Sequence, residues 1–151
     1  MLNIAIGSDH GGFELKEKIK ASGADKIKWV DVGAFDQQSS NYAEFAHLVA
    51  KKVQDRAVDF GILICRSGIG VSITANRYKG VYAALCLNKS MAQSARTHNN
   101  ANILCIAADY TSFEQAQEMI QIFLSATFET GGRHELRVET IDGVNDELYD
   151  N

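Results

Sequence analysis

Proline is absent from this chain of 151 residues, and tryptophan occurs only once. Without an X-Pro bond, folding has no slow prolyl isomerisation step. Turns must therefore be made by Gly, Asn, Asp and Ser, and the chain holds 12 glycines for that purpose.

Cysteine is also scarce, because Cys65, Cys86 and Cys105 are the only three and no two of them show CxxC spacing. An odd, unclustered set argues against a disulfide framework and against a structural zinc site. Each lies in or beside an apolar stretch, so we expect Cys86 and Cys105 to be small buried hydrophobes. Cys65 needs separate consideration, because an arginine, a serine and glycines follow it.

The chain has no dense basic block and a net charge of −4, which argues against nucleic acid or a membrane surface as its main partner. Its longest apolar runs, such as 60–65, are far shorter than the roughly 20 residues of a membrane span. The opening residues MLNIAIGSDH lead directly into a strand-like segment without the features of a secretory signal. We therefore expect a cytoplasmic protein.

Short apolar runs alternate with amphipathic segments along the chain. The expected strands are 2–7, 27–32, 59–65, 80–86 and 102–107. The expected helices are 13–22, 42–53, 69–77, 89–97 and 111–126. The last helix should begin at Thr111 or Ser112, with Glu114 in the capping box. The alternation predicts one α/β domain over residues 1–151, a three-layer Rossmann-like sandwich around a parallel sheet, with a polar tail at about 143–151.

Ligands of parallel sheets bind beyond the carboxyl ends of the strands, and a polar loop follows the first expected strand. This loop, GSDHGG at 7–12, leads into a helix. Asp9 can orient a hydroxyl group, and His10 can donate to a phosphate or carry a proton. An ordinary helix N-cap is the alternative explanation for these residues.

A second such loop, CRSGIGVS at 65–72, follows the third expected strand and has the layout of an anion hole. It has neither the GK[ST] of a nucleotide-binding loop nor a GxGxxG fingerprint. The backbone N–H groups around Gly68 and Gly70 can stabilise a developing enolate oxygen. Cys65, near a helix N-terminus and Arg66, is well placed to form a thiolate that removes a proton beside a carbonyl.

Two further clusters have ordinary explanations as well as functional ones. His98 and Asn99 follow a helix, where a polar turn is common. Arg133 and Arg137 are four residues apart, so on a helix they share one face and can clamp a phosphate, although a solvated helix end is the alternative. We expect His47 to be structural or exposed.

Taken in order, these motifs resemble the type B ribose-5-phosphate isomerase family, which includes the galactose-6-phosphate and allose-6-phosphate isomerases. The resemblance covers roughly residues 2–143 and is carried by GSDHGGF, by Tyr42, by DFGILICRSGIGVSITANR, by RTHNNANIL and by GGRHELRV. It implies a five-stranded parallel sheet and a homodimer or dimer of dimers with active sites shared between subunits. It also implies interconversion of aldose and ketose phosphates through a cis-enediolate, without metal or cofactor.

The resemblance assigns a role to each candidate residue. Cys65 is the base that moves a proton between C1 and C2, assisted by Ser67, while Gly68 and Gly70 belong to the anion hole. The remaining implied roles are ring opening by Asp9 and His98, contact with the reacting oxygens by Asn99, phosphate binding by His10, Arg133 and Arg137, and lining of the sugar site by Tyr42.

The chain departs from the family pattern at three positions. Arg66 stands where the family usually has glycine, Asp109 stands where it often has a phosphate-binding arginine, and Ala43 replaces a proline after Tyr42. We expect Arg66 and Asp109 to be linked. Arg66 either contacts substrate as the missing cation or pairs with Asp109 across a dimer; the simpler alternative is a solvent-facing arginine.

These features predict an isomerase that interconverts D-ribose 5-phosphate and D-ribulose 5-phosphate. An isomerase of a six-carbon sugar phosphate is the alternative within the same chemistry. A sugar-phosphate-binding protein without turnover is the alternative from another class. A flavodoxin-like domain is disfavoured because the first loop lacks the phosphate-binding pattern that flavin requires.

Overall fold

The computed structural model describes residues 1–22 and 26–143. The strands are β1 (Leu2–Ser8), β2 (Ile27–Asp31), β3 (Phe60–Cys65), β4 (Ala83–Cys86) and β5 (Ile103–Ala107). The helices are α1 (Phe13–Ala21), α2 (Tyr42–Gln54), α3 (Ile69–Ala75), α4 (Lys89–Thr97), the 3-10 turn η1 (Ala108–Tyr110), α5 (Phe113–Ser125) and α6 (Arg133–Asp142).

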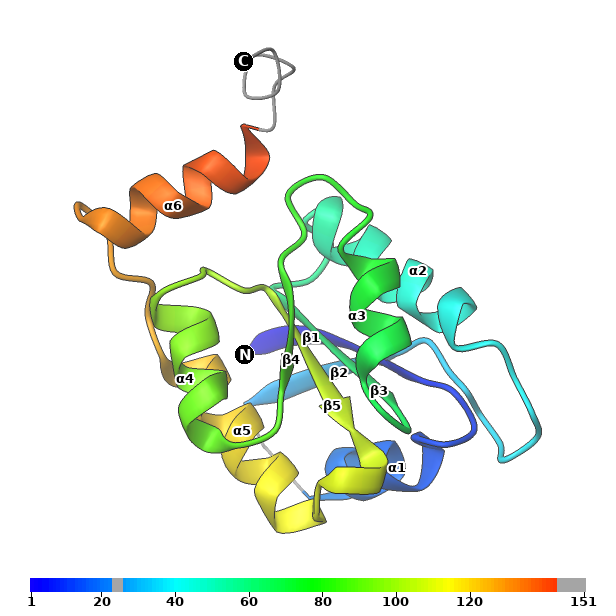
Figure 1. Ribbon diagram of the computed structural model, residues 1–151. Helices are drawn as coiled ribbons and strands as arrows, with labels where there is room; N and C mark the ends of the chain where they lie inside the picture. The colour runs from blue at the N-terminus through cyan, green and yellow to red at the C-terminus, as the bar shows by residue number, and fades with distance from the viewer. Residues whose placement is uncertain (23–25, 144–151) are drawn as a thin grey trace.

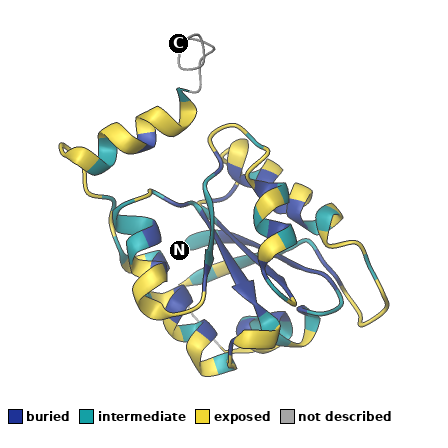
Figure 2. Ribbon diagram, in the orientation of Figure 1, coloured by how far each residue is buried: buried dark blue, intermediate teal, exposed yellow. Residues whose placement is uncertain are grey.

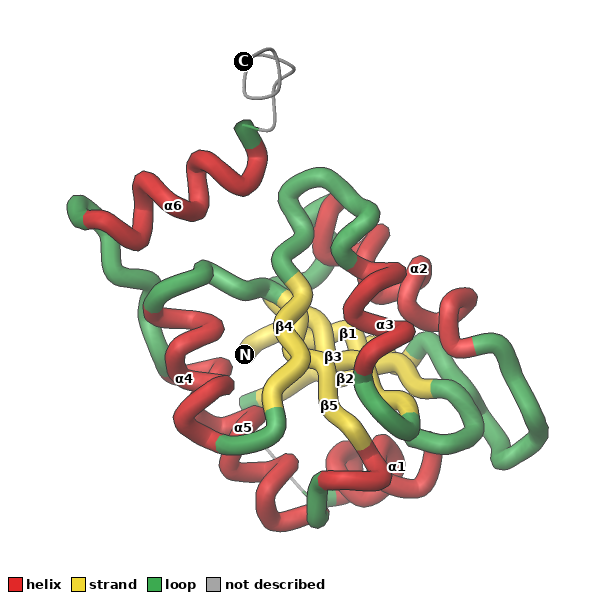
Figure 3. The backbone as a smooth tube through the Cα atoms, in the orientation of Figure 1, coloured by secondary structure: helices red, strands yellow, loops and turns green. Residues whose placement is uncertain are grey.

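All five strands are parallel and form one sheet in the order β2-β1-β3-β5-β4, so the predicted α/β architecture is confirmed. Helices α1, α4 and α5 cover one face, and α2 and α3 cover the other (Figures 1 and 3). The centre of the sheet is buried from both sides (Figure 2). A doubly covered parallel sheet needs continuous apolar strands, and FGILIC in β3 is such a run.

Alternation along β3 decides which way its last side chain points. Ile62 and Ile64 belong to the core beneath α1 and α5, whereas Leu63 and Cys65 belong to the core beneath α2 and α3. Successive strand side chains point to opposite faces. Cys65 therefore faces the layer that contains α3, the helix that follows it in the chain.

Most predicted elements are confirmed to within one or two residues, and the larger differences have local causes. β4 begins at Ala83 rather than at residue 80, because the Val81 N–H closes a turn by donating to Tyr78 O and the Tyr82 N–H donates to the Asn102 side chain. The capping box at α5 joins Ser112 to Gln115, so the prediction of Glu114 at that position was wrong.

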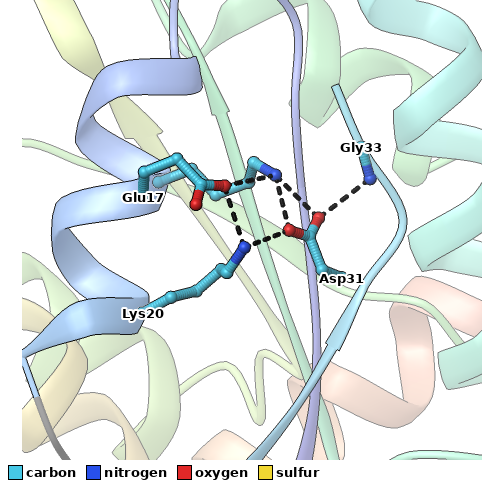
Figure 4. A network of polar contacts seen from close by, with 5 residues as sticks. Glu17, Lys20, Asp31 and Gly33 are labelled. Carbon is cyan, nitrogen blue, oxygen red and sulfur yellow. Dashed lines mark hydrogen bonds and ion pairs between the residues drawn. The ribbon is translucent and has the colours of Figure 1, made fainter. Parts of the chain in front are cut away.

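Lys16 shows that side chains on one helix can have very different surroundings. Lys16 is a charged residue between the apolar positions of α1, yet it is fully buried. Its ammonium group lies 2.7 Å from both carboxylate oxygens of Asp31 at the end of β2. Lys20 also contacts Asp31, and the Gly33 N–H donates to the same carboxylate over 2.9 Å (Figure 4).

Burial alone would raise the pKa of Asp31. The hydrogen bonds from Lys16, Lys20 and Gly33 outweigh it and hold that pKa below its ordinary value. The carboxylate therefore stays charged and anchors the chain where it leaves β2, at the carboxyl edge of the sheet.

Candidate active site

Cys65 is the last residue of β3, and its sulfur faces the start of α3. It is 4% exposed, and its Sγ accepts a hydrogen bond from the Gly68 N–H over 3.2 Å. Gly68 is the N-cap of α3 and has φ of +70°, a conformation that favours glycine. A Cβ at this position would lie 2.5 Å from Cδ1 of Leu85, so both backbone and space require glycine.

Cys86 and Cys105 are buried in the apolar core. All three cysteines are free and buried, and burial raises the pKa of Cys86 to about 11. Burial also raises the pKa of Cys105 well above its ordinary value. The expectation that these two behave as small hydrophobes is therefore confirmed.

The loop after Cys65 brings three more predicted residues together. Ser67 Oγ accepts a hydrogen bond from the Ile69 N–H over 3.3 Å, at the beginning of α3. Gly70 lies under the ring of Tyr42, because a Cβ there would meet Tyr42 ring carbons at 2.5 Å. Tyr42 is the first residue of α2 and remains 43% exposed.

Asp9 and His10 follow β1 at the same edge of the sheet. Asp9 is buried, and its Oδ1 accepts from the Gly12 N–H over 3.1 Å. His10 is held by Ser40: the His10 N–H donates to Ser40 Oγ over 3.1 Å, and the Ser40 N–H donates to His10 Nδ1 over 3.2 Å. Ser40 is a positioning residue that the sequence analysis missed.

The bond from Ser40 fixes the tautomer of His10. A backbone N–H can only donate, so Nδ1 must accept and the proton of the neutral ring must sit on Nε2. His10 therefore offers an Nε2–H donor to a ligand. A chain of backbone bonds supports this loop, in which Ser8 N–H donates to Gly33 O over 2.6 Å and Ala34 N–H donates to Ser8 O over 2.5 Å.

His98 is the C-cap of α4, and its ring stacks on that of His134 from α6, with centroids 4.1 Å apart. Nε2 of each ring lies 3.7 Å from a different oxygen of Glu129. Burial, the adjacent His98 ring and then Arg133 lower the pKa of His134. Neither His134 nor Glu129 was among the predicted site residues, although His134 lies inside the GGRHELRV motif.

Arg96 holds the turn that carries His98 and Asn99. Its Nη1 donates to Asn100 Oδ1 over 3.1 Å and to Ala101 O over 2.6 Å, and Asn100 has φ of +51°. The guanidinium also lies 4.9 Å from the centroid of the Phe60 ring. Arg96 therefore has a structural role.

Arg133 and Arg137 lie one turn apart on α6, and both are exposed. The helix that their spacing implied is thus present. It stands away from the three-layer body (Figure 1), and its far end contacts the body through a hydrogen bond between Tyr82 and Asp142.

The predicted residues form two groups, one at the carboxyl ends of the strands and one at their amino ends. One group follows strands β1 and β3 or begins α2, and it contains Asp9, His10, Tyr42, Cys65, Arg66, Ser67, Gly68 and Gly70. The other lies at the end of α4 and on α6, and it contains His98, Asn99, Arg133 and Arg137. Cys65 pairs with Ala107 at the far end of β5, whereas His98 precedes the start of that strand. The five residues of β5 alone span about 13 Å.

Arg66 and Asp109 pair within one chain. Arg66 Nη1 lies 3.4 Å from Asp109 Oδ1, and the Asp109 N–H donates to Arg66 O over 3.0 Å. The link between the two residues that the sequence predicted is present, but it needs no second subunit.

His98, Glu129 and His134 could offer ligand atoms to a metal ion, since these atoms lie within 4.8 Å of one another. The two rings are nearly parallel, at 11°, so their lone pairs point side by side instead of converging as a tetrahedral ion requires. Arg133 and Arg137 add positive charge nearby. We therefore assign no metal to this cluster.

Among the residues that the structure describes, none of the helices combines the length and the apolar character needed to cross a membrane.

Comparison with known proteins gives a consistent result over nearly the whole chain. Residues 4–141 match the family model described as Ribose/Galactose Isomerase. The ribose-5-phosphate isomerase B of Escherichia coli K12 is 38% identical over 145 residues, which cover 95% of this chain and 97% of that protein.

Solved structures of ribose-5-phosphate isomerases superpose closely on this chain. A ribose 5-phosphate isomerase from Thermotoga maritima superposes with a TM-score of 0.90 at 46% identity, covering 95% of this chain and 99% of that one. A ribose-5-phosphate isomerase B from Mycoplasma genitalium, solved with bound ribulose-5-phosphate, has a TM-score of 0.87 at 38% identity and covers 99% of this chain and 97% of that one. The chain therefore belongs to the Ribose/Galactose Isomerase family of sugar-phosphate aldose–ketose isomerases.

Proposed function

We propose that this protein interconverts D-ribose 5-phosphate and D-ribulose 5-phosphate, with Cys65 as the base. The observation that carries the proposal is the contact of 3.2 Å between the Gly68 N–H and Cys65 Sγ at the start of α3. This contact directs a backbone N–H donor at the sulfur that would accept the proton, in the loop where the family resemblance places the base. The names of the relatives, one of them solved with ribulose-5-phosphate, support the choice of substrate.

The reaction moves one proton between neighbouring carbons. The thiolate of Cys65 removes the proton from C2 of the open-chain aldose, and the electron pair forms the C1–C2 double bond of a cis-enediolate while O1 gains negative charge. Cys65 then returns the proton to C1, and the proton of the O2 hydroxyl passes to O1. The product has its carbonyl group at C2, and no electrons leave the substrate.

The anion hole stabilises the negative oxygen while Cys65 holds the proton. The backbone N–H groups around Gly68 and Gly70 belong to the N-cap and first turn of α3, and the Gly68 N–H contacts the sulfur directly. Removing the proton and stabilising the oxygen must act together, because a proton beside a carbonyl is only weakly acidic. The chemistry proposed here needs no metal or cofactor.

The remaining predicted residues act on the rest of the sugar phosphate. We assign ring opening to Asp9 and His98, contact with the reacting oxygens to Asn99, and lining of the sugar site to Tyr42. Phosphate binding falls to His10, Arg133 and Arg137, and Arg66 is placed among the residues that contact the substrate.

We propose that the complete site forms between two protomers, because one chain holds its two groups of residues at opposite ends of the strands. In a homodimer or a dimer of dimers, α6 and the end of α4 of one protomer would face the Cys65 loop of another. Exposed apolar side chains fit such contacts: Ile69 and Ile73 on α3 are 52% and 62% exposed, and Leu136 on α6 is 65% exposed. We place the protein in the cytoplasm, where free thiols persist.

Turnover of ribose 5-phosphate by the wild type and by the Cys65→Ala variant tests the proposal. The variant should lose at least about a thousandfold in kcat, as enzymes do without their catalytic base. Circular dichroism checks that the variant is folded. A wild type that is no faster than Cys65→Ala would contradict the isomerase proposal and favour a sugar-phosphate-binding protein without turnover.

A six-carbon substrate is the second candidate, because the matching family includes galactose isomerases and the Arg66–Asp109 pair changes the edge of the site. Allose 6-phosphate and galactose 6-phosphate are assayed beside ribose 5-phosphate. A larger kcat/KM for either would favour that candidate.

A further inference from the structure

Arg66 joins three loops at the carboxyl edge of the sheet. Its backbone follows β3, and its guanidinium reaches Asp109 in the turn after β5. Its side chain also crosses the loop after β1, because a Cβ on Gly11 would lie 2.6 Å from Arg66 Cγ and 3.3 Å from Arg66 Nε. Glycine at position 11 therefore makes room for this arginine.

The path of Arg66 places it at the side of the proposed reaction centre. The same point above Gly11 that touches Arg66 lies 3.3 Å from Oδ1 of Asp9. Arg66 therefore lies beside Asp9, to which we assign ring opening, and it directly follows Cys65 in the chain.

The contact between Arg66 and Asp109 contributes little to stability. Their side chains are 63% and 47% exposed, and the single contact is 3.4 Å long. Water screens the attraction in exposed pairs of this kind. A guanidinium has five N–H donors, so a single contact leaves most of them available to a ligand.

We propose that Arg66 binds the phosphate group of the substrate and that Asp109 is a positioning residue for its guanidinium. This inference rests on the proposed sugar-phosphate substrate and adds the source of one phosphate contact. A planar guanidinium suits two oxygens of a phosphate, and partial exposure leaves it accessible to one. Asp109, fixed by its own N–H bond to Arg66 O, keeps the long side chain above Gly11 before the ligand arrives.

The Arg66→Gln variant tests the phosphate contact, because glutamine keeps part of the side chain's length and removes the charge. We expect KM for ribose 5-phosphate and the inhibition constant of inorganic phosphate to rise by about tenfold to a hundredfold, with little change in kcat. Arg77→Gln, an exposed arginine after α3 at the opposite edge of the sheet, is the control and should change neither. Unchanged phosphate inhibition in Arg66→Gln would overturn the proposal.

The Asp109→Asn variant distinguishes a positioning role of Asp109 toward Arg66 from simple repulsion between the Asp109 carboxylate and the phosphate. If Asp109 orients Arg66, this variant binds inorganic phosphate several-fold more weakly, and the Arg66→Gln/Asp109→Asn double variant is no worse than Arg66→Gln alone. Tighter phosphate binding by Asp109→Asn, or additive losses in the double variant, would contradict the positioning role.

Calorimetric titration with inorganic phosphate keeps this test separate from the proposed reaction, because it needs no turnover. An inactive wild type that binds phosphate through Arg66 would overturn the isomerase proposal alone. An active wild type whose phosphate affinity is the same in Arg66→Gln would overturn this inference alone.

Discussion

The N–H of Gly68 donates to the sulfur of Cys65 over 3.2 Å, and this bond links the proposed base to the proposed anion hole. It depends on a left-handed residue at position 68, since φ there is +70°. A single backbone conformation therefore both directs an N–H toward the sulfur and begins α3.

Gly68→Ala should remove activity and stability together. The left-handed conformation costs about 1–2 kcal/mol for alanine, and the new Cβ would also meet Leu85 at 2.5 Å. Displacing one anion-hole donor lowers kcat by about a hundredfold or more. Urea unfolding and steady-state kinetics measure the two effects.

Gly80→Ala is the matched control for this variant. Gly80 has φ of +76°, but a Cβ there would meet nothing within 4 Å. The control should be destabilised only by the cost of the left-handed conformation, and its kcat should not change. Equal effects of the two substitutions on kcat would show that the Gly68 contact does not matter for the reaction.

The neutral ring of His10 should carry its proton on Nε2. The Ser40 N–H donates to Nδ1 over 3.2 Å, which excludes a proton from that atom. Nitrogen-15 correlation spectra of the imidazole distinguish the two tautomers and the cation directly. A neutral ring with its proton on Nδ1 would contradict this assignment.

Asp31→Asn should destabilise the fold, because it leaves the ammonium group of Lys16, 0% exposed, with Glu17 at 3.1 Å as its remaining carboxylate partner. Breaking a buried ion pair by removing one partner typically costs about 3–5 kcal/mol. Asp55→Asn is the control, since the pair between Asp55 and Lys51 is half-exposed and should contribute less than about 1 kcal/mol. Chemical unfolding at pH 7 compares the two variants.

At low pH, the contribution of Asp31 to the free energy of unfolding should be lost. Its pKa in the folded protein lies below the ordinary value of 3.8, so folding favours the ionised form. The contribution is complete above pH 3.8 and is lost as the pH falls through the lower folded pKa. The difference in unfolding free energy between wild type and Asp31→Asn should therefore shrink below that pH, and a difference that grows in acid would contradict it.

Two inactive variants should restore activity to each other if the active site is shared. A mixed dimer of Cys65→Ala and His98→Ala has one site with both substitutions and one with neither. After unfolding and refolding together in equal amounts, the mixture should show about a quarter of wild-type activity. Each variant refolded alone is the control. A mixture as inactive as its components would place the whole site within one chain.

The order of the elements follows from local patterns, which is why the sequence predicts it well. Buried strands such as β3 are continuous apolar runs, and helix α4 was predicted from Lys89 to Thr97 with both ends correct. The capping box of α5 was harder, since Thr111 and Ser112 both offer a hydroxyl. Only the backbone path selects Ser112, whose partner is Gln115.

The sequence by itself determined the strand–loop–helix at Cys65 and the shared helix of Arg133 and Arg137, because both depend on residues close together in the chain. The tertiary structure decided that Ser40 holds His10, that Lys16 is buried against Asp31, and that Arg66 pairs with Asp109 in its own chain. These partners are 30, 15 and 43 residues apart. Packing of the sheet brings such loops together at one edge, and no local propensity specifies which side chains then meet.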